Sequence, residues 1–130
     1  MKVAIDTNRL TDLFRGDASL AKWLGQCEAV FVPLPVLAEL KVGFLNGVRK
    51  HENESILQRF LAKPSVAILL QSRETAEHYA RLYVQLKNAG TPIPINDVWI
   101  AALALEHDLA LVTRDRHFDR IPQLIQAKSE

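Results

Sequence analysis

Short, wholly apolar segments alternate along this chain with longer segments whose apolar residues recur at helical spacing. The short segments lie at residues 2–5, 29–32, 66–70 and 109–112, and their length and composition predict buried strands. Strands that are apolar on both faces need a covering layer on each side, and the helices between parallel strands provide it. The alternation therefore predicts an α/β fold, a three-layer α/β/α sandwich with a central parallel sheet.

The helical segments have recognisable ends. Helices are predicted up to about residue 16 and over residues 17–25, 33–47, 51–62, 76–90 and 97–107. Asp17 and Asn96 are the expected N-caps of two of them, because Asp and Asn side chains accept hydrogen bonds from first-turn amides. Residues 91–95 are expected to form an extended loop, and residues 124–126 a last short strand. The length of 130 residues and the absence of an internal repeat predict a single domain over residues 1–130.

Four acidic residues lie inside or beside apolar stretches, where a charge is costly: Asp6, Glu39, Asp97 and Asp115. Asp6 and Asp115 follow predicted strands, and Asp97 begins the helix that leads into the last main strand. Ligands of parallel α/β sheets bind beyond the carboxyl ends of the strands, so topology brings these three acids to one edge. Glu39 lies in the middle of a helix among apolar neighbours, which indicates a face turned inward or toward a cleft.

Carboxylates that converge need a cation. Two unit charges about 5 Å apart repel by about 3 kcal/mol at an effective dielectric constant of about 20. Ligation by oxygen alone favours Mg²⁺ or Mn²⁺, and such a metal activates water and clamps a scissile phosphate. Each aspartate also has a purely structural explanation: Asp6 as the cap of a turn, Asp97 as a first-turn helix acid, and Asp115 as the ion-pair partner of Arg114 or Arg116.

The distribution of charge is more informative than its sum, because 16 Lys and Arg face 15 Asp and Glu. Setting the four clustered acids aside leaves eleven acidic residues against sixteen basic ones. The residues that flank Asp115 include Arg114, Arg116, His117 and Arg120. An acidic centre with a basic rim suits a metal site that holds a phosphate backbone, and a solvated loop is the plain alternative.

Two further features bear on location. The single cysteine, Cys27, excludes an internal disulfide, and the chain is therefore expected to be intracellular, by default cytoplasmic. No apolar run approaches the roughly 20 residues needed to cross a bilayer, so a membrane is not an expected partner.

Four motifs in order resemble those of the PIN-domain ribonucleases, and most closely the VapC toxins of bacterial toxin–antitoxin pairs. They are Asp6-Thr7-Asn8 after the first strand, Glu39-Leu40 on a helix, the run Asn-Asp-Val-Trp-Ile-Ala-Ala at 96–102 and the run Thr-Arg-Asp-Arg-His-Phe at 113–118. No one of these motifs is specific alone. Together they cover essentially the full chain.

The resemblance implies a function and a set of roles. Asp6, Glu39, Asp97 and Asp115 would bind Mg²⁺, or Mn²⁺, for hydrolysis of RNA phosphodiesters, with tRNA or rRNA as substrate. Thr113 would hydrogen-bond a carboxylate or the water of the site. The supporting residue Asn8 would orient Asp6. The protein would act as the toxin of a type II toxin–antitoxin system that inhibits translation.

The resemblance also implies partners. The toxins of this family are homodimers, held inactive by a small cognate antitoxin whose tail enters the acidic groove. Apolar residues of the first helices and of the helix that carries Glu39 are candidates for that partner surface: Leu10, Leu13, Phe14, Leu20, Trp23, Leu24, Leu37, Phe44 and Leu45. Packing of the same residues inside the domain is an equally good explanation.

The remaining candidates have simpler explanations. Asp119 is expected at the surface, Trp99 in the core, and His117 packed beside Phe118 or facing a phosphate. The rival function is a receiver-type phosphoacceptor domain, which shares the length, the doubly wound sheet and an acidic Mg²⁺ pocket. That class needs adjacent acids after the first strand and a Lys at the end of a late strand. This chain has Thr7 after Asp6 and no such Lys.

Overall fold

The computed structural model describes residues 1–128, so the last two residues of the domain predicted over 1–130 lie outside the described part. Five strands form one sheet in the order β3-β2-β1-β4-β5, and every neighbouring pair is parallel. The strands are β1 (Lys2–Ile5), β2 (Ala29–Pro33), β3 (Val66–Leu69), β4 (Ala110–Val112) and β5 (Gln126–Ala127). The predicted parallel sheet is confirmed.

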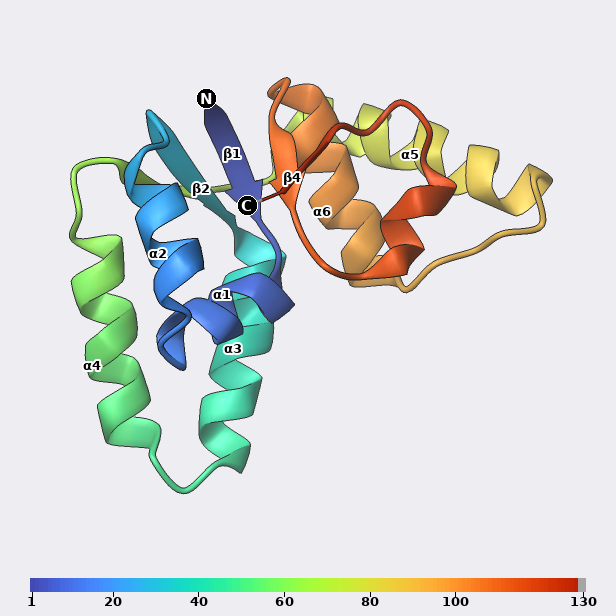
Figure 1. Cartoon of the computed structure of the whole chain (residues 1–130). Coiled ribbons are helices and arrows are strands. Elements are labelled where there is room, and N and C mark those ends of the chain that lie inside the picture. Colours follow the sequence, from blue (N-terminus) through green and yellow to red (C-terminus); the bar gives the residue numbers. More distant parts are fainter. Residues whose placement is uncertain (129–130) are drawn as a thin grey trace.

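Helices cover both faces of this sheet. They are α1 (Thr7–Phe14), α2 (Ala18–Gly25), α3 (Leu34–Asn46), α4 (Lys50–Leu61), α5 (Arg73–Asn88) and α6 (Ile95–Glu106), with a short 3-10 helix η1 (Arg116–Arg120) after β4. In Figure 1, α2 and α4 lie on one side of the strands, and α5 and α6 lie on the other. The three-layer α/β/α architecture is therefore confirmed.

The apolar strands lie in one continuous core. Val3, Ala4 and Ile5 of β1 have no exposed surface, and Leu111 of β4 has none. The edge strand β3 differs, because Ile68 is 41% exposed and Ala67 is exposed as well. The expectation that all strands are covered on both faces therefore fails at β3, the edge strand of the sheet, where Ala67 and Ile68 are exposed.

Local chemistry explains where two helices begin. Oδ1 of Asp17 accepts a hydrogen bond from the Leu20 amide at 3.0 Å, so the predicted N-cap of α2 is confirmed. The predicted Asn96 cap is wrong, because α6 begins at Ile95 with Pro94 at the N-cap position. Proline holds its backbone at φ −54°, ψ 146°, which delivers the chain into the helix without a side-chain cap.

The last strand also lies further along the chain than predicted, at Gln126–Ala127 instead of residues 124–126. The amide of Leu124 donates to the carbonyl of Ile121 at 3.2 Å, which holds this segment in a turn. Pairing with β4 then begins with the Leu111 amide, which donates to the carbonyl of Ile125 at 2.8 Å. The turn explains the later start of β5.

The strand order positions the site. The chain first adds strands on one side of β1, as β2 and β3, and then on its other side, as β4 and β5. The switch point therefore lies between β1 and β4. Ile5 is paired with Val112, and the Asp6 amide donates to the Val112 carbonyl at 2.9 Å. The order 3-2-1-4-5 differs from the 2-1-3-4-5 order of receiver domains, which weighs against the rival function.

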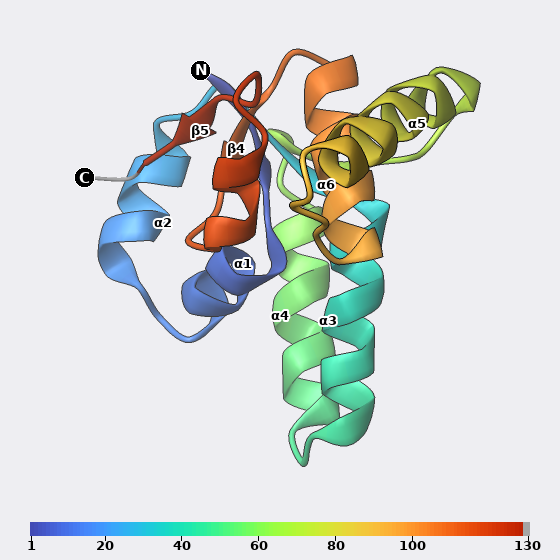
Figure 2. The same ribbon diagram turned by 90° about the vertical axis from the view of Figure 1, so that its right-hand side faces the viewer.

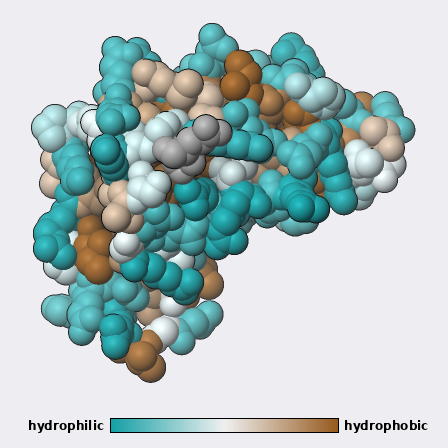
Figure 3. Space-filling model, viewed as in Figure 1, coloured by the Kyte–Doolittle hydropathy of each residue, from teal (hydrophilic) through white to brown (hydrophobic). Residues whose placement is uncertain are grey.

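The outline of the molecule is angular. The α3–α4 hairpin projects as one arm and α5 as another, and Figures 1 and 2 show both arms from two directions. The start of α1, the start of α6 and η1 lie at the inner corner. Figure 3 shows that the surface around this corner is mainly hydrophilic, while an apolar spot marks the tip of the α3–α4 arm. Within the described residues, no helix is long and apolar enough to cross a membrane.

Candidate metal centre

The four predicted acids arrive at the inner corner from four different elements. Asp6 is the N-cap of α1 directly after β1, and Asp115 precedes η1 after β4. Asp97 lies in the first turn of α6, and Glu39 lies in the middle of α3. Each of Asp6 and Asp97 is within electrostatic range of the three other members of the set. The fold therefore brings together all four residues that the sequence analysis singled out.

Asp6 is the most firmly held of the four. It is 4% exposed, its Oδ1 accepts the Thr7 amide at 2.8 Å, and its Oδ2 accepts the Thr113 hydroxyl at 2.7 Å. The same hydroxyl accepts the amide of Asp115 at 3.0 Å. Thr113 thus links the ends of β1 and β4 and fixes the positions of both aspartates. Asp6 also caps α1, so it has both the structural role and a place in the site.

Asp97 and Asp115 face each other across the ring of His117. Nδ1 of His117 lies 3.1 Å from Oδ2 of Asp97 and 3.0 Å from Oδ1 of Asp115. The backbone amide of His117 also donates to Oδ1 of Asp115 at 2.9 Å. One ligand atom from each of these three residues can be chosen so that all lie within 4.8 Å of one another. His117 is therefore part of the cluster, whereas the sequence analysis expected it to pack or to face a phosphate.

Glu39 supplies a buried oxygen without a well-aligned hydrogen-bond partner. It lines an open cleft of about 500 Å³ together with Asp97, Asp115 and His117. Within the described residues, its Oε1 and the hydroxyl of Thr7 are both buried, and neither makes a well-aligned hydrogen bond, although Thr7 and Asn96 lie close enough to lower the pKa of Glu39. A buried, charged oxygen without a well-aligned donor costs free energy unless a cation approaches it.

The pKa values of the clustered acids also indicate a site that would favour a bound cation. Burial is the main cause that raises the pKa of Asp6, of Glu39 and of Asp97 above their ordinary values. The next cause for Glu39 and Asp97 is the negative charge of Asp6, which raises both pKa values further. Hydrogen bonds oppose the rise, from Thr113 at Asp6 and from His117 at Asp97. The cluster therefore holds negative charge that the surrounding residues do not neutralise.

These residues fit a divalent metal. The donor set consists mainly of carboxylate oxygens, which are the ligands that suit Mg²⁺ and Mn²⁺. The buried Oε1 of Glu39 and the mutual repulsion of Asp6 and Asp97 are features that a bound cation would relieve. The site is also open to the solvent, so a metal and a substrate can enter.

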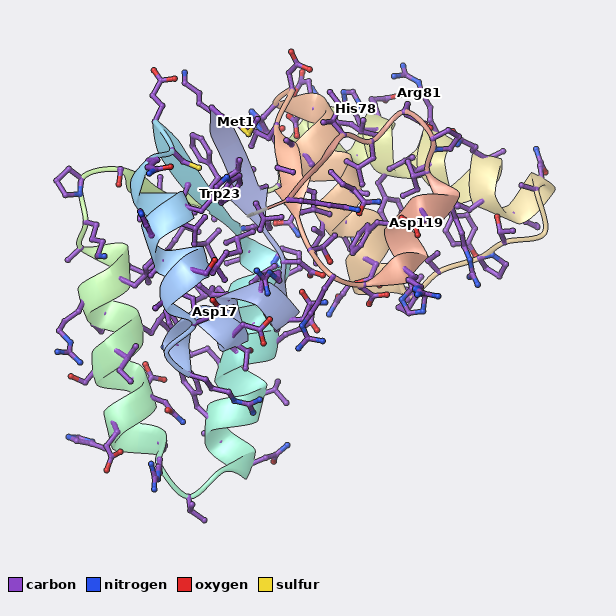
Figure 4. The ribbon with its side chains drawn as sticks, viewed as in Figure 1. Met1, Asp17, Trp23, His78, Arg81 and Asp119 are labelled. Carbon is purple, nitrogen blue, oxygen red and sulfur yellow. The ribbon has the colours of Figure 1, made fainter. Side chains whose placement is uncertain are left out.

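Other predicted residues lie near the cluster. Asn8 accepts a hydrogen bond from the Arg114 amide at 3.4 Å through its Oδ1, so it contacts the loop after Thr113 and not the Asp6 carboxylate. Asp119 is exposed on η1 (Figure 4), and it accepts the Gln126 side-chain amide at 2.9 Å.

The aromatic residue of α6 is explained by packing. The ring of Trp99 stacks on that of Tyr79 from α5, with ring centroids 4.1 Å apart and planes at 26°. This contact joins the two helices that cover one face of the sheet. Trp99 therefore packs as the sequence analysis expected.

A basic rim lies beside the acidic centre, and its anchor was missed in the sequence. Asp12 on α1 accepts Nε of Arg114 at 2.9 Å and Nη2 of Arg114 at 3.2 Å, and it accepts Nη1 of Arg9 at 3.0 Å. The hydrogen bond from Arg114 is the main cause that lowers the pKa of Asp12. A second cleft runs along this rim past Arg9, Arg114, Arg116 and Lys128. No spacing in the sequence indicates this pairing, because Asp12 and Arg114 lie 102 positions apart.

Comparison with known proteins decides the family. The profile of the PIN domain matches residues 3–124. The chain belongs to the PIN-domain family. Among curated relatives of this PIN domain, the ribonuclease VapC2 of Rickettsia felis is 36% identical over 91 residues, which cover 69% of this chain and 66% of the relative. The toxin FitB of Neisseria gonorrhoeae is 32% identical over 125 residues and 87% of each chain.

Solved structures agree with the sequence comparison. The toxin–antitoxin complex VapBC2 of Rickettsia felis, bound to a DNA fragment from its promoter, contains a chain that superposes on this PIN domain with a TM-score of 0.90. The two chains are 28% identical, and the match covers 100% of both. The resemblance drawn from the four motifs is therefore confirmed, and the receiver-type alternative is not favoured.

Proposed function

We propose that this PIN domain is a divalent-metal-dependent endoribonuclease and the toxin of a type II toxin–antitoxin pair. The observation that carries the proposal is the cluster of Asp6, Glu39, Asp97 and Asp115, in which Asp6 and Asp97 are buried and Glu39 and Asp115 are half-buried, at the switch point of the sheet. The names of the VapC relatives support RNA as the substrate class, and we infer inhibition of translation as the consequence. Cleavage of tRNA or rRNA would produce that inhibition.

Asp6, Glu39, Asp97 and Asp115 would hold the metal, with Mg²⁺ or Mn²⁺ as the candidates. When bound, the metal supplies Lewis acidity toward a phosphoryl oxygen and makes a water a better nucleophile. Hydrolysis forms a bond between the water oxygen and phosphorus and breaks the bond between phosphorus and the leaving ribose oxygen. The ribose oxygen takes up a proton, and the other water proton is released.

The residues around the acids have positioning roles. Thr113 holds Oδ2 of Asp6 and the amide of Asp115, so it keeps these two carboxylates in register. Arg114, fixed by Asp12, and the exposed Arg116 give the rim positive charge where the RNA backbone would pass. Phosphate contacts of this kind supply affinity without sequence readout. The selection of one RNA over another is therefore assigned to other contacts.

We also propose a cognate antitoxin, because several matching structures are complexes of a toxin with its antitoxin. A cleft between α1, α3 and α4 is lined by Phe14, Leu40 and Phe44 and reaches Glu39 at one end. The apolar lining of this cleft fits an amphipathic segment whose apolar side fills the cleft and whose end reaches the acids. On the α3–α4 arm, Val42, Leu45 and Val48 are 58%, 67% and 100% exposed.

Only part of the apolar surface predicted for that partner is available. Leu10, Leu20, Leu24 and Phe44 are buried in the core, and Leu45 is exposed. The others are partly buried and pack against the core: Leu13, Phe14, Trp23 and Leu37. Most of that set is therefore core, and the antitoxin surface is assigned to the cleft and the tip of the α3–α4 arm.

A homodimer is proposed on a different surface. Tyr83, Ile93 and Ile95 line an apolar cleft beside α5 and α6, and Tyr83 and Ile95 are 46% and 53% exposed. Pairing of two copies through this surface would bury these side chains and bring two acidic sites near one interface. Light scattering on the purified toxin measures the mass directly, and Ile95→Glu is expected to convert a dimer into a monomer.

The nuclease proposal has a direct test. The purified chain, freed of antitoxin, is incubated with total cellular RNA in Mn²⁺ or Mg²⁺, beside a lane with EDTA and a lane with Asp97→Asn. We expect discrete fragments that depend on the metal and are absent from both controls. Sequencing of the fragment ends would identify the RNA and the bond. Fragments of the same pattern from a folded Asp97→Asn protein would refute the assignment of the site.

A further inference from the structure

His117 lies on a different element from each of the four carboxylates and contacts two of them. It lies on η1, and the hydrogen bond from its own amide to Oδ1 of Asp115 fixes the backbone at this point. Its Nδ1 then faces Oδ2 of Asp97 at 3.1 Å and Oδ1 of Asp115 at 3.0 Å. The ring edge thus points between two carboxylates that come from different elements.

A single hydrogen bond accounts for only one of the two short contacts that Nδ1 makes. The nitrogen Nδ1 carries at most one proton, which can be directed well at one acceptor. Here two carboxylate oxygens lie at nearly equal distances from it. One ligand atom from each of Asp97, Asp115 and His117 lies within 4.8 Å of the other two, which is close enough for all three to contact one cation.

The distances fit coordination. In an octahedral site with bonds of about 2.1 Å, adjacent ligand atoms are separated by about 3 Å. The two nitrogen–oxygen distances of 3.1 Å and 3.0 Å match the edges of such an octahedron. The His117 side chain is 41% exposed, so packing does not enclose the ring on every side.

We propose that His117 is a direct ligand of the metal through Nδ1, so that Asp97, Asp115 and His117 form one face of a mixed oxygen and nitrogen site. This inference rests on the proposed metal-dependent function and deepens it. An imidazole ligand lowers the relative affinity for Mg²⁺, which prefers oxygen, and favours first-row transition metals. The physiological candidate is then Mn²⁺ ahead of Mg²⁺, in contrast to the oxygen-only site expected from the sequence.

The decisive measurement is pulsed electron paramagnetic resonance of the full chain loaded with Mn²⁺. A directly bound imidazole nitrogen gives a nitrogen-14 coupling in the electron spin echo modulation, and we expect this coupling in the native protein. His117→Asn places an amide where Nδ1 was, so it keeps a hydrogen-bond donor but removes the nitrogen ligand. We expect His117→Asn to lose the coupling and to weaken Mn²⁺ binding by about tenfold or more, with a smaller change for Mg²⁺.

Two controls separate the possible failures. His78→Gln removes a histidine on α5, outside the cluster (Figure 4), and should leave the coupling and both metal affinities unchanged. Mn²⁺ binding that depends on Asp97 but shows no nitrogen coupling would overturn the role of His117 and leave the nuclease proposal standing. Mn²⁺ binding that is equal in Asp97→Asn and native protein would overturn both.

Discussion

Asp6 and Asp12 belong to the same short helix, yet their charges are stabilised in opposite ways. Asp12 accepts hydrogen bonds from Arg9 and Arg114, and its pKa is lowered, first by the bond from Arg114. Asp6 is buried beside other acids, and its pKa is raised, first by that burial. Asp12 is hydrogen-bonded to two cationic side chains, whereas the charge of Arg114 is only the smallest of the influences on the pKa of Asp6.

The difference separates structural acids from functional ones. A carboxylate that only holds elements together is most stable when its counter-charge is permanent, as Asp12 shows with Arg114. A carboxylate that must bind an exchangeable cation cannot have a permanent one, so the fold carries the repulsion in its metal-free state. Each pair at about 5 Å costs about 3 kcal/mol at an effective dielectric constant of about 20.

Activity is the property on which the two aspartates should differ most. Loss of a residue that only supports a metal ligand costs about 10- to 100-fold, so loss of a ligand should cost at least about 100-fold. Asp97→Asn is therefore expected to reduce RNA cleavage by about 100-fold or more, while Asp12→Asn should retain activity within about tenfold. Initial rates on the identified RNA measure both. Equal losses in the two variants would remove the distinction between the two kinds of acid.

Metal should stabilise the protein through the acidic cluster alone. A ligand at about 100 times its dissociation constant stabilises the folded state by about 2.7 kcal/mol, which is about 8–10 °C in Tm for a domain of this size. Native protein and Asp12→Asn are expected to show this increase with Mn²⁺ in thermal scans. Asp97→Asn should show little of it. An increase of the same size in Asp97→Asn would place the metal elsewhere.

Without metal, the two substitutions should change stability in opposite directions. Asp97→Asn removes a negative charge that faces Asp6 and Asp115, and we expect Tm to rise by about 4–7 °C in EDTA. Asp12→Asn removes an ion pair at a partly exposed position, which is screened by water, and we expect Tm to fall by about 1–3 °C. Thermal scans in EDTA give both values. A fall in Tm for Asp97→Asn would mean that its contact with His117 outweighs the repulsion.

The basic rim should affect binding more than catalysis. Arg114→Gln, made in the inactive Asp97→Asn background, is expected to weaken RNA binding by about three- to tenfold and to reduce the slope of log affinity against log salt by about one. Arg81→Gln on α5 is the matched control, because it changes the net charge equally at a position away from the rim (Figure 4). Fluorescence anisotropy at several salt concentrations gives both slopes. Identical slopes would show that the rim does not contact RNA.

The sequence predicted the parts of the site that depend on topology. Asp6 and Asp115 follow parallel strands, and the ends of neighbouring parallel strands must meet at one edge. Asp97 could be placed there because its helix leads into β4. Glu39 was found because a charge in an apolar helix face needs a purpose. These inferences need only the order and direction of the elements.

The contacts that were missed depend on side-chain geometry across distant segments. The pairing of Asp12 with Arg114 joins α1 to the loop after β4, and neither residue stands out locally. His117 enters the cluster because η1 turns the chain directly after Asp115, and a turn of this kind has little sequence signature. The spacing of Asp115 and His117 by two residues was the available signal. The wrong Asn96 cap has a similar cause, since Pro94 already positions the first turn.

The smallest expected difference between the two aspartates is in how each makes the stability of the fold depend on pH. Burial, followed by neighbouring charge for Glu39 and Asp97, raises the pKa values of these two acids, and burial raises that of Asp6. A carboxyl whose pKa is higher in the folded state than in the unfolded state binds its proton more tightly when folded. Its stabilisation is therefore present at acid pH and is lost as the pH rises through the folded pKa. Asp12 has the opposite sign, and its stabilisation is lost only as the pH falls through its lowered pKa.

In EDTA, lowering the pH through the raised pKa values of these acids should therefore raise the Tm of the native protein. Asp97→Asn should show a smaller increase, because one of the repelling acids is gone and the pKa values of its neighbours move back toward their ordinary range. Saturating Mn²⁺ should reverse the trend, since protons and metal compete for the same oxygens. A native protein whose Tm falls steadily over this range in EDTA would show that acids with permanent partners, such as Asp12, control its stability.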